Sequence, residues 1–419
     1  NMRYLISELD ATYNEESKLV FWHKYVNFHG GDPHEHGKSN QDFLNHTLGV
    51  TGIIFGMAAT TNPDESEVGI AYSTNTKNVW KGEVTGHQTE WGQTQNWTAG
   101  RVPLSSDDVL IPSGLAYYPS LTEDVVAQSI EILSGASLTA NTYNITISGA
   151  EGAWINSGTF NAGTGKVIFN HGVPAEIVTV SGTTNFYNIE CGENTTMQPV
   201  AGCMLRIEGN GTAFASSVVD FSTINNTVEY NGVNQTIVNP NGMNGNSGYY
   251  NLRFSGSGTK TMPVTAMNIT GNLIISGNAN VTAASSLTIG GNLNIVDTST
   301  FNTGNYNHTL RGSFENNATF VSVTGYSLTM TSSTEKYISG DSLVNFKNLY
   351  INNDERVLVF ANLSISNTLT LTKGYLCLGG AKNLPESKLI SGKTNNKTPK
   401  SQAGDGFSDQ TLIVISGDI

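Results

Sequence analysis

Three short segments of the chain share one pattern of glycine and alternating apolar residues. They are Ile269-Thr-Gly-Asn-Leu-Ile-Ile275, Ile289-Gly-Gly-Asn-Leu-Asn-Ile295 and Leu310-Arg-Gly-Ser-Phe-Glu315. Their glycines at 271, 291 and 312 recur at intervals of roughly 20 residues, which is the length of one turn in many β-solenoids. Apolar residues at every second position predict strands with one buried face. A pattern that returns once per turn predicts parallel strands stacked on one another, and therefore a rod.

A longer repeat of about three turns overlies the short one between about residues 155 and 380. Its three copies carry an aromatic-x-Asn-aliphatic pattern, in Phe186–Ile189, Tyr249–Leu252 and Phe346–Leu349. The corners between strands take Gly, Asn, Ser, Thr and Asp, which tolerate a positive φ or bond their own backbone. An inward amide at Asn188, Asn251 or Asn348 would be costly, so we expect it to bond the turn backbone or a stacked partner.

The composition agrees with an all-β repeat protein and argues against other classes. Of the 419 residues, 45 are Gly and only 13% are charged, and few stretches follow a helical period. The net charge of −13 and the lack of a basic cluster argue against a nucleic-acid partner. No run of about 18 apolar residues occurs, so we expect no membrane span. The prediction is a parallel β-helix (β-solenoid) of about twelve rungs over residues 125–380, with strands of 3–7 residues and almost no helix.

The regions on either side of the coil differ from it in composition. Residues 1–78 hold most of the histidines and several alternating runs, and we interpret them as the C-terminal part of a β-rich, sandwich-like domain. Residues 381–419 form a polar loop and a final strand, and we expect the chain to continue beyond them. Low charge and surfaces rich in Thr, Ser and Asn suit an extracellular protein.

Residues 79–124 form a segment rich in tryptophan that precedes the coil. Trp80, Trp91 and Trp97 lie within 18 residues of one another in a chain with only five tryptophans. The open end of a solenoid exposes apolar side chains and unpaired strand edges, and large aromatic side chains can cover both. We therefore predict that these three tryptophans form a structural cap at the N-terminal end of the coil.

Two groups of side chains are candidate metal ligands. His34 and His36, with Asp32 beside them, have a spacing that suits a divalent metal such as zinc if the segment is an extended strand, whereas the Gly and Pro around them favour a solvated loop. Asp107 and Asp108 precede a strand, where they would ligate calcium or cap turn amides. No other cofactor is predicted.

The three cysteines leave an odd count. Cys191 and Cys203 flank strands and would either meet across a turn as a disulfide or remain thiols. Cys377 follows a leucine in a strand, and we expect a buried thiol there.

Catalytic chemistry is hard to find in this sequence. Lyases and glycosidases built on β-helices need carboxylates clustered with each other or with Arg and Lys on one outer face. Between residues 155 and 345 the carboxylates show no common spacing, Arg206, Arg253 and Arg311 are expected as outward surface residues, and His308 is the only histidine after residue 173. Tyrosines at 117, 118, 249 and 250 would either stack on sugars or pack in the core. We therefore predict no catalytic residue.

The cap segment carries a motif that resembles a known family. It reads W-x-G, E-W, N-W-x-x-G-x-V-P and D-D-V-x-I-P between residues 80 and 112, followed by S-I-E-I-L-S-G-A-S-L-T and later by F-Y-N-I. The pattern resembles large secreted surface proteins of Bacteroidota, which have parallel β-helices, act as adhesins or surface coats, and leave the cell through the type IX secretion system. The resemblance covers residues 79–380 and implies a place on the cell surface.

The resemblance also implies partners. These are the secretion machinery of the outer membrane, and glycans or neighbouring molecules at the cell surface. Two hypotheses follow: a non-enzymatic adhesin or stalk that binds glycans or displays other domains, and a carbohydrate-active enzyme of the polysaccharide lyase or glycoside hydrolase type. The scattered charges favour the first hypothesis. A third possibility is that the chain is mainly cargo of its secretion machinery.

Overall fold

The computed structural model describes residues 77–210, 218–240 and 248–378, and outside them the backbone of seven short strands. These are β1 (Met2–Arg3), β2 (Leu19–Tyr25), β3 (His34–Gly37), β4 (Asn40–Asp42), β5 (Thr47–Gly49), β6 (Ser66–Tyr72) and β38 (Ile413–Ile415). The first six pair only antiparallel, in the orders β1-β5-β4 and β3-β2-β6. The pairings from β7 (Asn78–Val79) onward are parallel, which marks a change of architecture along the chain.

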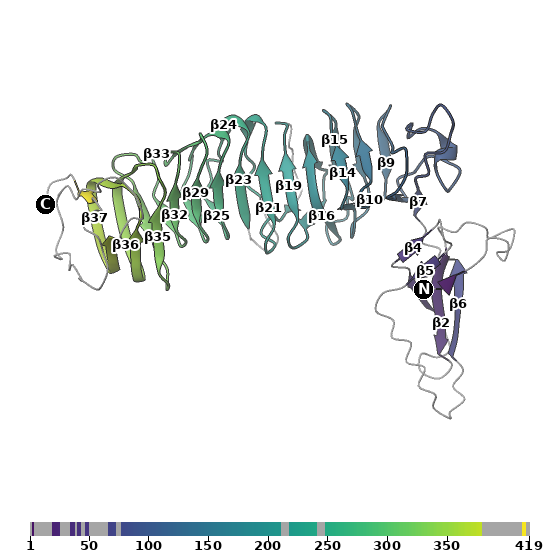
Figure 1. Ribbon diagram of the computed structural model, residues 1–419, viewed down its shortest axis with the longest axis horizontal. Coiled ribbons are helices and arrows are strands. Elements are labelled where there is room, and N and C mark those ends of the chain that lie inside the picture. The colour runs from purple at the N-terminus through teal and green to yellow at the C-terminus, as the bar shows by residue number, and fades with distance from the viewer. Residues whose placement is uncertain are drawn as a thin grey trace, which may run out of the picture.

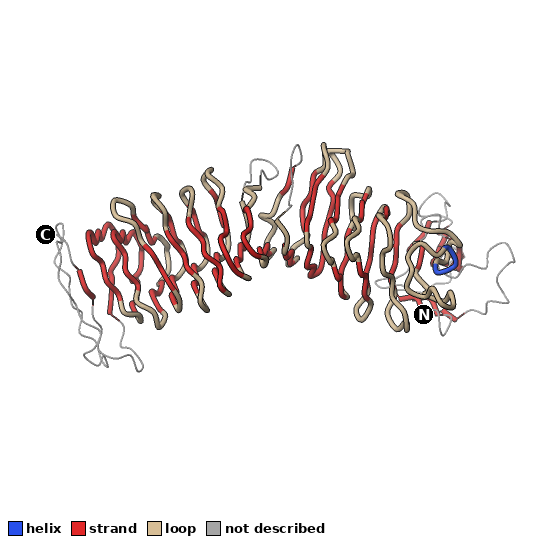
Figure 2. Tube along the Cα trace, turned by 90° about the horizontal axis from the view of Figure 1, so that it is seen from above, coloured by secondary structure: helices blue, strands red, loops and turns tan. Residues whose placement is uncertain are grey.

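From β8 onward the chain coils into a parallel β-solenoid of about 12 turns, drawn out as a long stack of strands in Figure 1. The all-β, parallel β-helix predicted from the repeats is confirmed. Within the described residues the only helical element is η3, a single 3₁₀ turn at Thr94–Asn96. Seen from above in Figure 2, the stack is bent rather than straight.

Each turn adds a strand to as many as three faces, which we call the first, second and third face in chain order. The first face holds β8 (Asp108–Ile111), β10 (Ser129–Ile132), β13 (Trp154–Asn156), β18 (Thr196–Pro199), β20 (Val218–Val219), β25 (Met267–Ile269), β28 (Leu287–Ile289), β31 (His308–Leu310) and β34 (Ser327–Met330). The second face holds β11 (Ser137–Thr139), β14 (Thr159–Asn161), β19 (Met204–Ile207), β21 (Thr227–Tyr230), β23 (Asn251–Phe254), β26 (Leu273–Ile275), β29 (Leu293–Ile295), β32 (Phe314–Asn316) and β35 (Lys336–Ser339).

The third face is made of two separate sheets. The first sheet holds β9 (Val125–Ala127), β12 (Ile145–Ile147), β15 (Lys166–Phe169) and β17 (Asn188–Cys191). The second sheet holds β22 (Val233–Thr236), β24 (Ser257–Thr261), β27 (Asn278–Thr282), β30 (Thr300–Asn302) and β33 (Thr319–Val321). Because β8 is already paired with β10, parallel stacking begins one turn before the start expected at residue 125.

Three strands are longer than the expected 3–7 residues. β16 (Ile177–Phe186) has 10 residues and turns from the first to the second face at Gly182, where φ is 80°. β36 (Val344–Val359) and β37 (Leu363–Leu378) have 16 residues each, and their pairing shifts register at several points. Such bulges let a strand bend around a corner without ending, so the last turns form continuous ribbons.

Two predicted columns of side chains run through the interior of the coil. The cross-strand neighbours are Leu273, Leu293 and Phe314 in one column and Ile269, Ile289 and Leu310 in the other. All six are at most 1% exposed. The register inferred from the three aligned segments is therefore confirmed.

Asparagine side chains tie successive turns together between the first and second faces. The Oδ1 atom of Asn251 accepts the backbone N–H of Asn272 at 2.9 Å, and Asn272 in turn accepts that of Asn292 at 2.8 Å. Asn292 continues the ladder by accepting the N–H of Ser313. A Cβ on Gly291 would lie 2.4 Å from Asn272 Oδ1, so the repeated glycine makes room for the ladder.

The asparagines of the longer repeat behave as expected where their bonds are described. The Nδ2 group of Asn251 donates to the carbonyl of Asn226 at 3.1 Å, while its Oδ1 belongs to the ladder. Asn348 donates to the carbonyl of Tyr326 at 2.8 Å and accepts from Asn367 on the next turn. Both amides therefore bond turn backbone and a stacked partner, which offsets the cost of burial.

The three predicted cap tryptophans pack together at the N-terminal end of the coil. Trp80, Trp91 and Trp97 are each 1% exposed, and Trp97 lies edge-to-face against Trp80 at 5.0 Å and Trp91 at 4.6 Å. The indole of Trp97 donates to the carbonyl of Trp91, and that of Trp80 to the carbonyl of Tyr117 at 3.0 Å. All three rings are buried and the indole N–H groups of Trp80 and Trp97 are bonded, as is usual for tryptophans of a protein core.

A buried lysine marks the middle of the coil. Lys260 on β24 is fully buried, and its Nζ donates to the carbonyl of Gly232 at 2.6 Å and to Oε1 of Gln235 at 2.7 Å. Gln235 donates onward to the carbonyls of Ile207 and Gly209. Burial lowers the pKa of Lys260 to about 8, because desolvation disfavours the ammonium.

Candidate functional site

The third face has two sheets, and the outer surface of the second one carries mainly threonine and asparagine side chains. We call it the Thr/Asn face and define it by Thr259, Thr261, Asn280, Thr282, Thr300, Asn302, Thr319 and Val321. Cross-strand pairing sets these residues in two ranks, Thr259-Asn280-Thr300-Thr319 and Thr261-Thr282-Asn302-Val321. None of the eight side chains is charged.

The interior holds this array in place. The residues between the outward ones are buried, with Val281, Phe301 and Phe320 pointing into the coil. Parallel strands place successive rungs about 4.8 Å apart, and alternate residues about 7 Å apart along a strand. Because threonine is stiff at χ1, the hydroxyl and methyl groups repeat with little freedom. The face therefore offers a regular set of neutral hydrogen-bonding groups.

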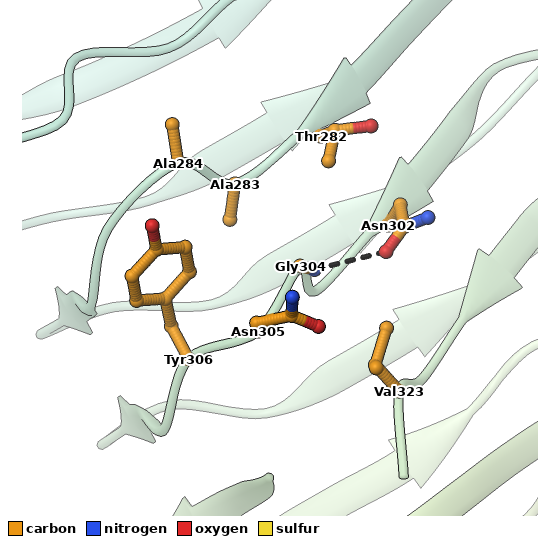
Figure 3. Close-up of a pocket in the computed structure, with 8 residues that line it drawn as sticks. All are labelled: Thr282, Ala283, Ala284, Asn302, Gly304, Asn305, Tyr306 and Val323. Carbon is orange, nitrogen blue, oxygen red and sulfur yellow. Dashed lines mark hydrogen bonds between the residues drawn. The ribbon is translucent and has the colours of Figure 1, made fainter.

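A shallow groove of about 360 Å³ lies along one edge of the Thr/Asn face (Figure 3). Asn305 and Tyr306 reach it from the corner after β30, Thr282 from the end of β27, and Val323 from the following turn. The corner bends tightly because Gly304 has φ near 59° and donates its N–H to Asn302 Oδ1 at 2.9 Å.

The groove combines one aromatic ring with neutral polar groups. Tyr306 is half-buried, so one part of its ring remains accessible beside Asn305. Sugars bind proteins through stacking on such rings together with hydrogen bonds from amides and hydroxyls. The arrangement suits a neutral sugar better than an ion. Tyr306 was not among the tyrosines singled out from the sequence. The Thr-Phe-Asn pattern of β30, which also occurs in β14, marks a strand and not the aromatic residue in the corner after it.

The side chains of the predicted metal ligands Asp32, His34 and His36 lie outside the described part of the chain. Asp32 is not among the described residues, and for His34 and His36 only the backbone of β3 is described, so that prediction remains untested. Within residues 77–210, 218–240 and 248–378, no three His, Cys, Asp or Glu side chains gather closely enough to hold a metal ion.

The two aspartates before β8 are engaged in protein contacts. Asp107 pairs with Arg101 and accepts the backbone N–H of Leu104 at 2.8 Å. The hydrogen bond from Arg101 lowers the pKa of Asp107. Asp108 instead accepts the hydroxyl of Ser129 on the next turn at 2.5 Å. Asp107 thus caps a turn, whereas Asp108 links two rungs.

Three charged residues that are far apart in the sequence come together on the second face. Arg206, Glu229 and Arg253 occupy equivalent outward positions on β19, β21 and β23 of the second face. Glu229 Oε2 lies 2.9 Å from Arg206 Nε, and Oε1 lies 3.3 Å from Arg253 Nε. Arg311, expected as an outward surface residue like Arg206 and Arg253, lies in the corner after β31 and not on a strand.

The tyrosines and histidine considered for function divide between core and surface. Tyr249 is fully buried, and its hydroxyl lies 3.0 Å from that of Tyr230. Tyr117 is exposed, whereas Tyr118 packs against the core. His308 is buried, with Nδ1 accepting the N–H of Leu287 and Nε2 facing the carbonyl of Thr303. Desolvation lowers its pKa, so His308 is a neutral structural residue.

The cysteines do not form a disulfide. Cys191 and Cys203 are buried free thiols, and Cys191 Sγ lies 3.5 Å from the sulfur of Met197. Burial raises the pKa of Cys203 to about 12, and it raises that of Cys191 further. Cys377, expected to be buried, is only partly so. The two buried thiols are thus inert core residues.

Comparisons with known proteins give no relative from which a function can be transferred. Searches of protein-family models, of curated proteins and of solved structures each returned no match. Among the described residues, no helix is long and apolar enough to cross a membrane.

Proposed function

We propose that this chain is a non-enzymatic extracellular protein whose coil serves as a shaft and whose Thr/Asn face binds glycans. The observation that carries the proposal is the Thr/Asn face itself, with the Tyr306 groove along its edge. Neutral hydroxyl and amide groups at fixed spacing match the hydroxyl-rich surface of a sugar chain. Each contact is weak, and repetition over several rungs supplies avidity.

Binding of a glycan array by the purified chain tests the proposal. We expect Tyr306→Ala to weaken binding of the preferred neutral oligosaccharide about tenfold, since stacking on an aromatic ring contributes on the order of 1 kcal/mol or more. Asn302→Ala, which removes the acceptor of the Gly304 N–H, should weaken it as well. Tyr350→Ala changes an exposed tyrosine on β36 and serves as the control. If Tyr306→Ala and Asn302→Ala bound the oligosaccharide as tightly as the wild type and Tyr350→Ala do, the proposal would be contradicted.

The cellular context of the proposal is the surface of a bacterium of the Bacteroidota. The cap motif between residues 80 and 112 supports it, because it resembles surface proteins exported by the type IX secretion system. On this view the secretion machinery of the outer membrane is a transient partner. Antibody labelling of intact cells, with and without a working type IX system, is the test. Equal labelling of both strains would refute this route of export.

A carbohydrate-active enzyme is the second hypothesis, and the Arg206–Glu229–Arg253 cluster is the observation that favours it. A carboxylate beside two arginines on an outer face is what such chemistry requires. Glu229, however, also accepts the hydroxyl of Ser255 at 2.6 Å, so three donors surround it and its side chain is only 7% exposed. A carboxylate held in this way is better placed to orient the arginines than to move protons.

A further inference from the structure

The Arg206–Glu229–Arg253 cluster is built into the second face by the register of the strands. Each of the three residues lies between two buried apolar residues of its strand, so all three side chains leave the same side of the sheet. They stand on consecutive turns, which places the outer two about 10 Å apart along the axis of the coil.

Glu229 accepts a hydrogen bond from the Nε of Arg206 and forms an ion pair with the Nε of Arg253. Arg206 contacts Oε2 of Glu229. Arg253 and the hydroxyl of Ser255 both contact Oε1. Arg253 Nε also lies 3.4 Å from the hydroxyl of Ser276. Because a guanidinium is planar, holding its Nε sets the direction in which the two Nη groups point.

The Nη groups of both arginines remain available to a ligand. They have no hydrogen-bond partner among the residues that the structure describes, and the two side chains are 41% and 38% exposed. Two arginines against one glutamate leave a positive charge, in a chain whose net charge is −13. The nearest other carboxylate in sequence, Glu208, accepts a hydrogen bond from Asn185.

We propose that Arg206 and Arg253 bind the anionic groups of an acidic polysaccharide. Guanidinium groups with free Nη atoms are suited to two parallel hydrogen bonds with a carboxylate or a sulfate. Two such forks along the axis of the coil fit a chain that carries anionic groups at intervals and lies across the strands. The site is on a different face from the Tyr306 groove, so a test of one site does not depend on the outcome at the other.

Dextran, carboxymethyl-dextran and dextran sulfate test this site, because they share one backbone and differ in charge. We expect the full chain to bind at least one charged form at least tenfold more tightly than dextran, and the affinity to fall with added salt. The pair of charged forms shows whether carboxylate or sulfate is preferred. Equal binding of all three polymers would overturn the proposal.

Variants separate a built site from general attraction. Arg206→Gln with Arg253→Gln should reduce binding of the preferred charged polymer at least tenfold, whereas Arg311→Gln with Arg356→Gln, which removes the same charge elsewhere, should leave it within twofold. Equal losses in the two double variants would refute the site. Tyr306→Ala should not affect this binding.

Two single variants decide the matter if the double variant fails to fold. Arg206→Lys keeps the charge and loses the fork, so we expect binding several-fold weaker. Glu229→Gln makes the surface more positive but releases both guanidinium groups, so a built site loses affinity where simple attraction would gain it. Tighter binding by Glu229→Gln, or unchanged binding by Arg206→Lys, would overturn the proposal.

Discussion

Leu273 and Leu293 are cross-strand neighbours on β26 and β29, one directly above the other inside the coil. Each is at most 1% exposed. Phe314 on β32 continues the column, so Leu293 has a counterpart on the turn above and on the turn below. In such a stack the stability of a turn depends on its two neighbours.

Leu293→Asp should therefore be severely destabilising. The change places a carboxylate in the column without a partner, and we expect a loss of at least about 4 kcal/mol in the free energy of unfolding. Chemical denaturation monitored by circular dichroism measures it. Asn294→Asp, at the neighbouring outward position, is the control and should cost less than about 1 kcal/mol. Similar midpoints for both variants would contradict the register.

Trp97→Ala should lower the melting temperature without altering glycan binding. The ring contacts Trp80 and Trp91, and its removal leaves a cavity that costs about 3–5 kcal/mol. Differential scanning calorimetry, with binding measured below the transition, tests both parts. Tyr117→Ala, which truncates an exposed ring beside the cap, is expected to be nearly neutral. Loss of binding at unchanged stability would assign Trp97 to recognition instead.

Gly291→Ala should destabilise the coil more than Gly100→Ala. A Cβ at residue 291 would lie 2.4 Å from Asn272 Oδ1 and 2.6 Å from a backbone carbon, so the ladder must shift. Gly100 has a positive φ of 64° but open space around it, so its variant reports backbone strain of about 1 kcal/mol alone. The melting temperatures of the two variants, measured by thermal unfolding, give the comparison. A lower melting temperature for Gly100→Ala would show that the asparagine ladder shifts at little cost to admit the Cβ.

The stability contributed at Lys260 should depend on pH. Its folded-state pKa, lowered to about 8, lies below the usual 10.5, so the folded chain releases this proton earlier than the unfolded chain. The contribution of Lys260 to the free energy of unfolding therefore increases as the pH rises above about 8. Between pH 7 and pH 9.5, wild type should gain about 2 kcal/mol relative to Lys260→Met. A constant difference between the two proteins over this range would refute the shift.

The purified segment 79–419 should show no turnover on pectin, alginate or glycosaminoglycans. Glu229 is surrounded by donors, and both ring nitrogens of the buried His308 face backbone groups, which leaves neither residue free for proton transfer. Release of reducing or unsaturated sugar ends is the measurement. Steady release that Glu229→Gln abolishes would establish the enzyme hypothesis.

Much of the fold was predictable because it depends on local periodicity. The alternation around Gly271, Gly291 and Gly312 identified the strands, and their spacing identified the parallel register. The long ribbons β36 and β37 were not predicted, because a bulge leaves no glycine or proline in the sequence of β36 to mark the corner. The early start at β8 was missed because this strand was assigned to the cap segment, although it precedes its partner β10 by one turn.

The surface clusters were harder to predict, because they depend on the length of every turn between them. Arg206 and Glu229 are 23 residues apart, and Arg311 lies outside the register that Arg206 and Arg253 share. A signal was present in Leu205-Arg-Ile207, Val228-Glu-Tyr230 and Leu252-Arg-Phe254, which all place a charge between two apolar residues. The Tyr306 groove lies in a corner, where no periodicity applies.

The asparagine ladder makes the length of the molecule adjustable. Asn272 and Asn292 occupy equivalent places 20 residues apart, so removing or duplicating the stretch between them joins one corner to an identical one. The ladder and the interior columns would keep their register, because each turn contacts mainly the turns next to it. A gene encoding such a coil can grow or shrink by whole turns, and natural selection can thus tune the length of the coil.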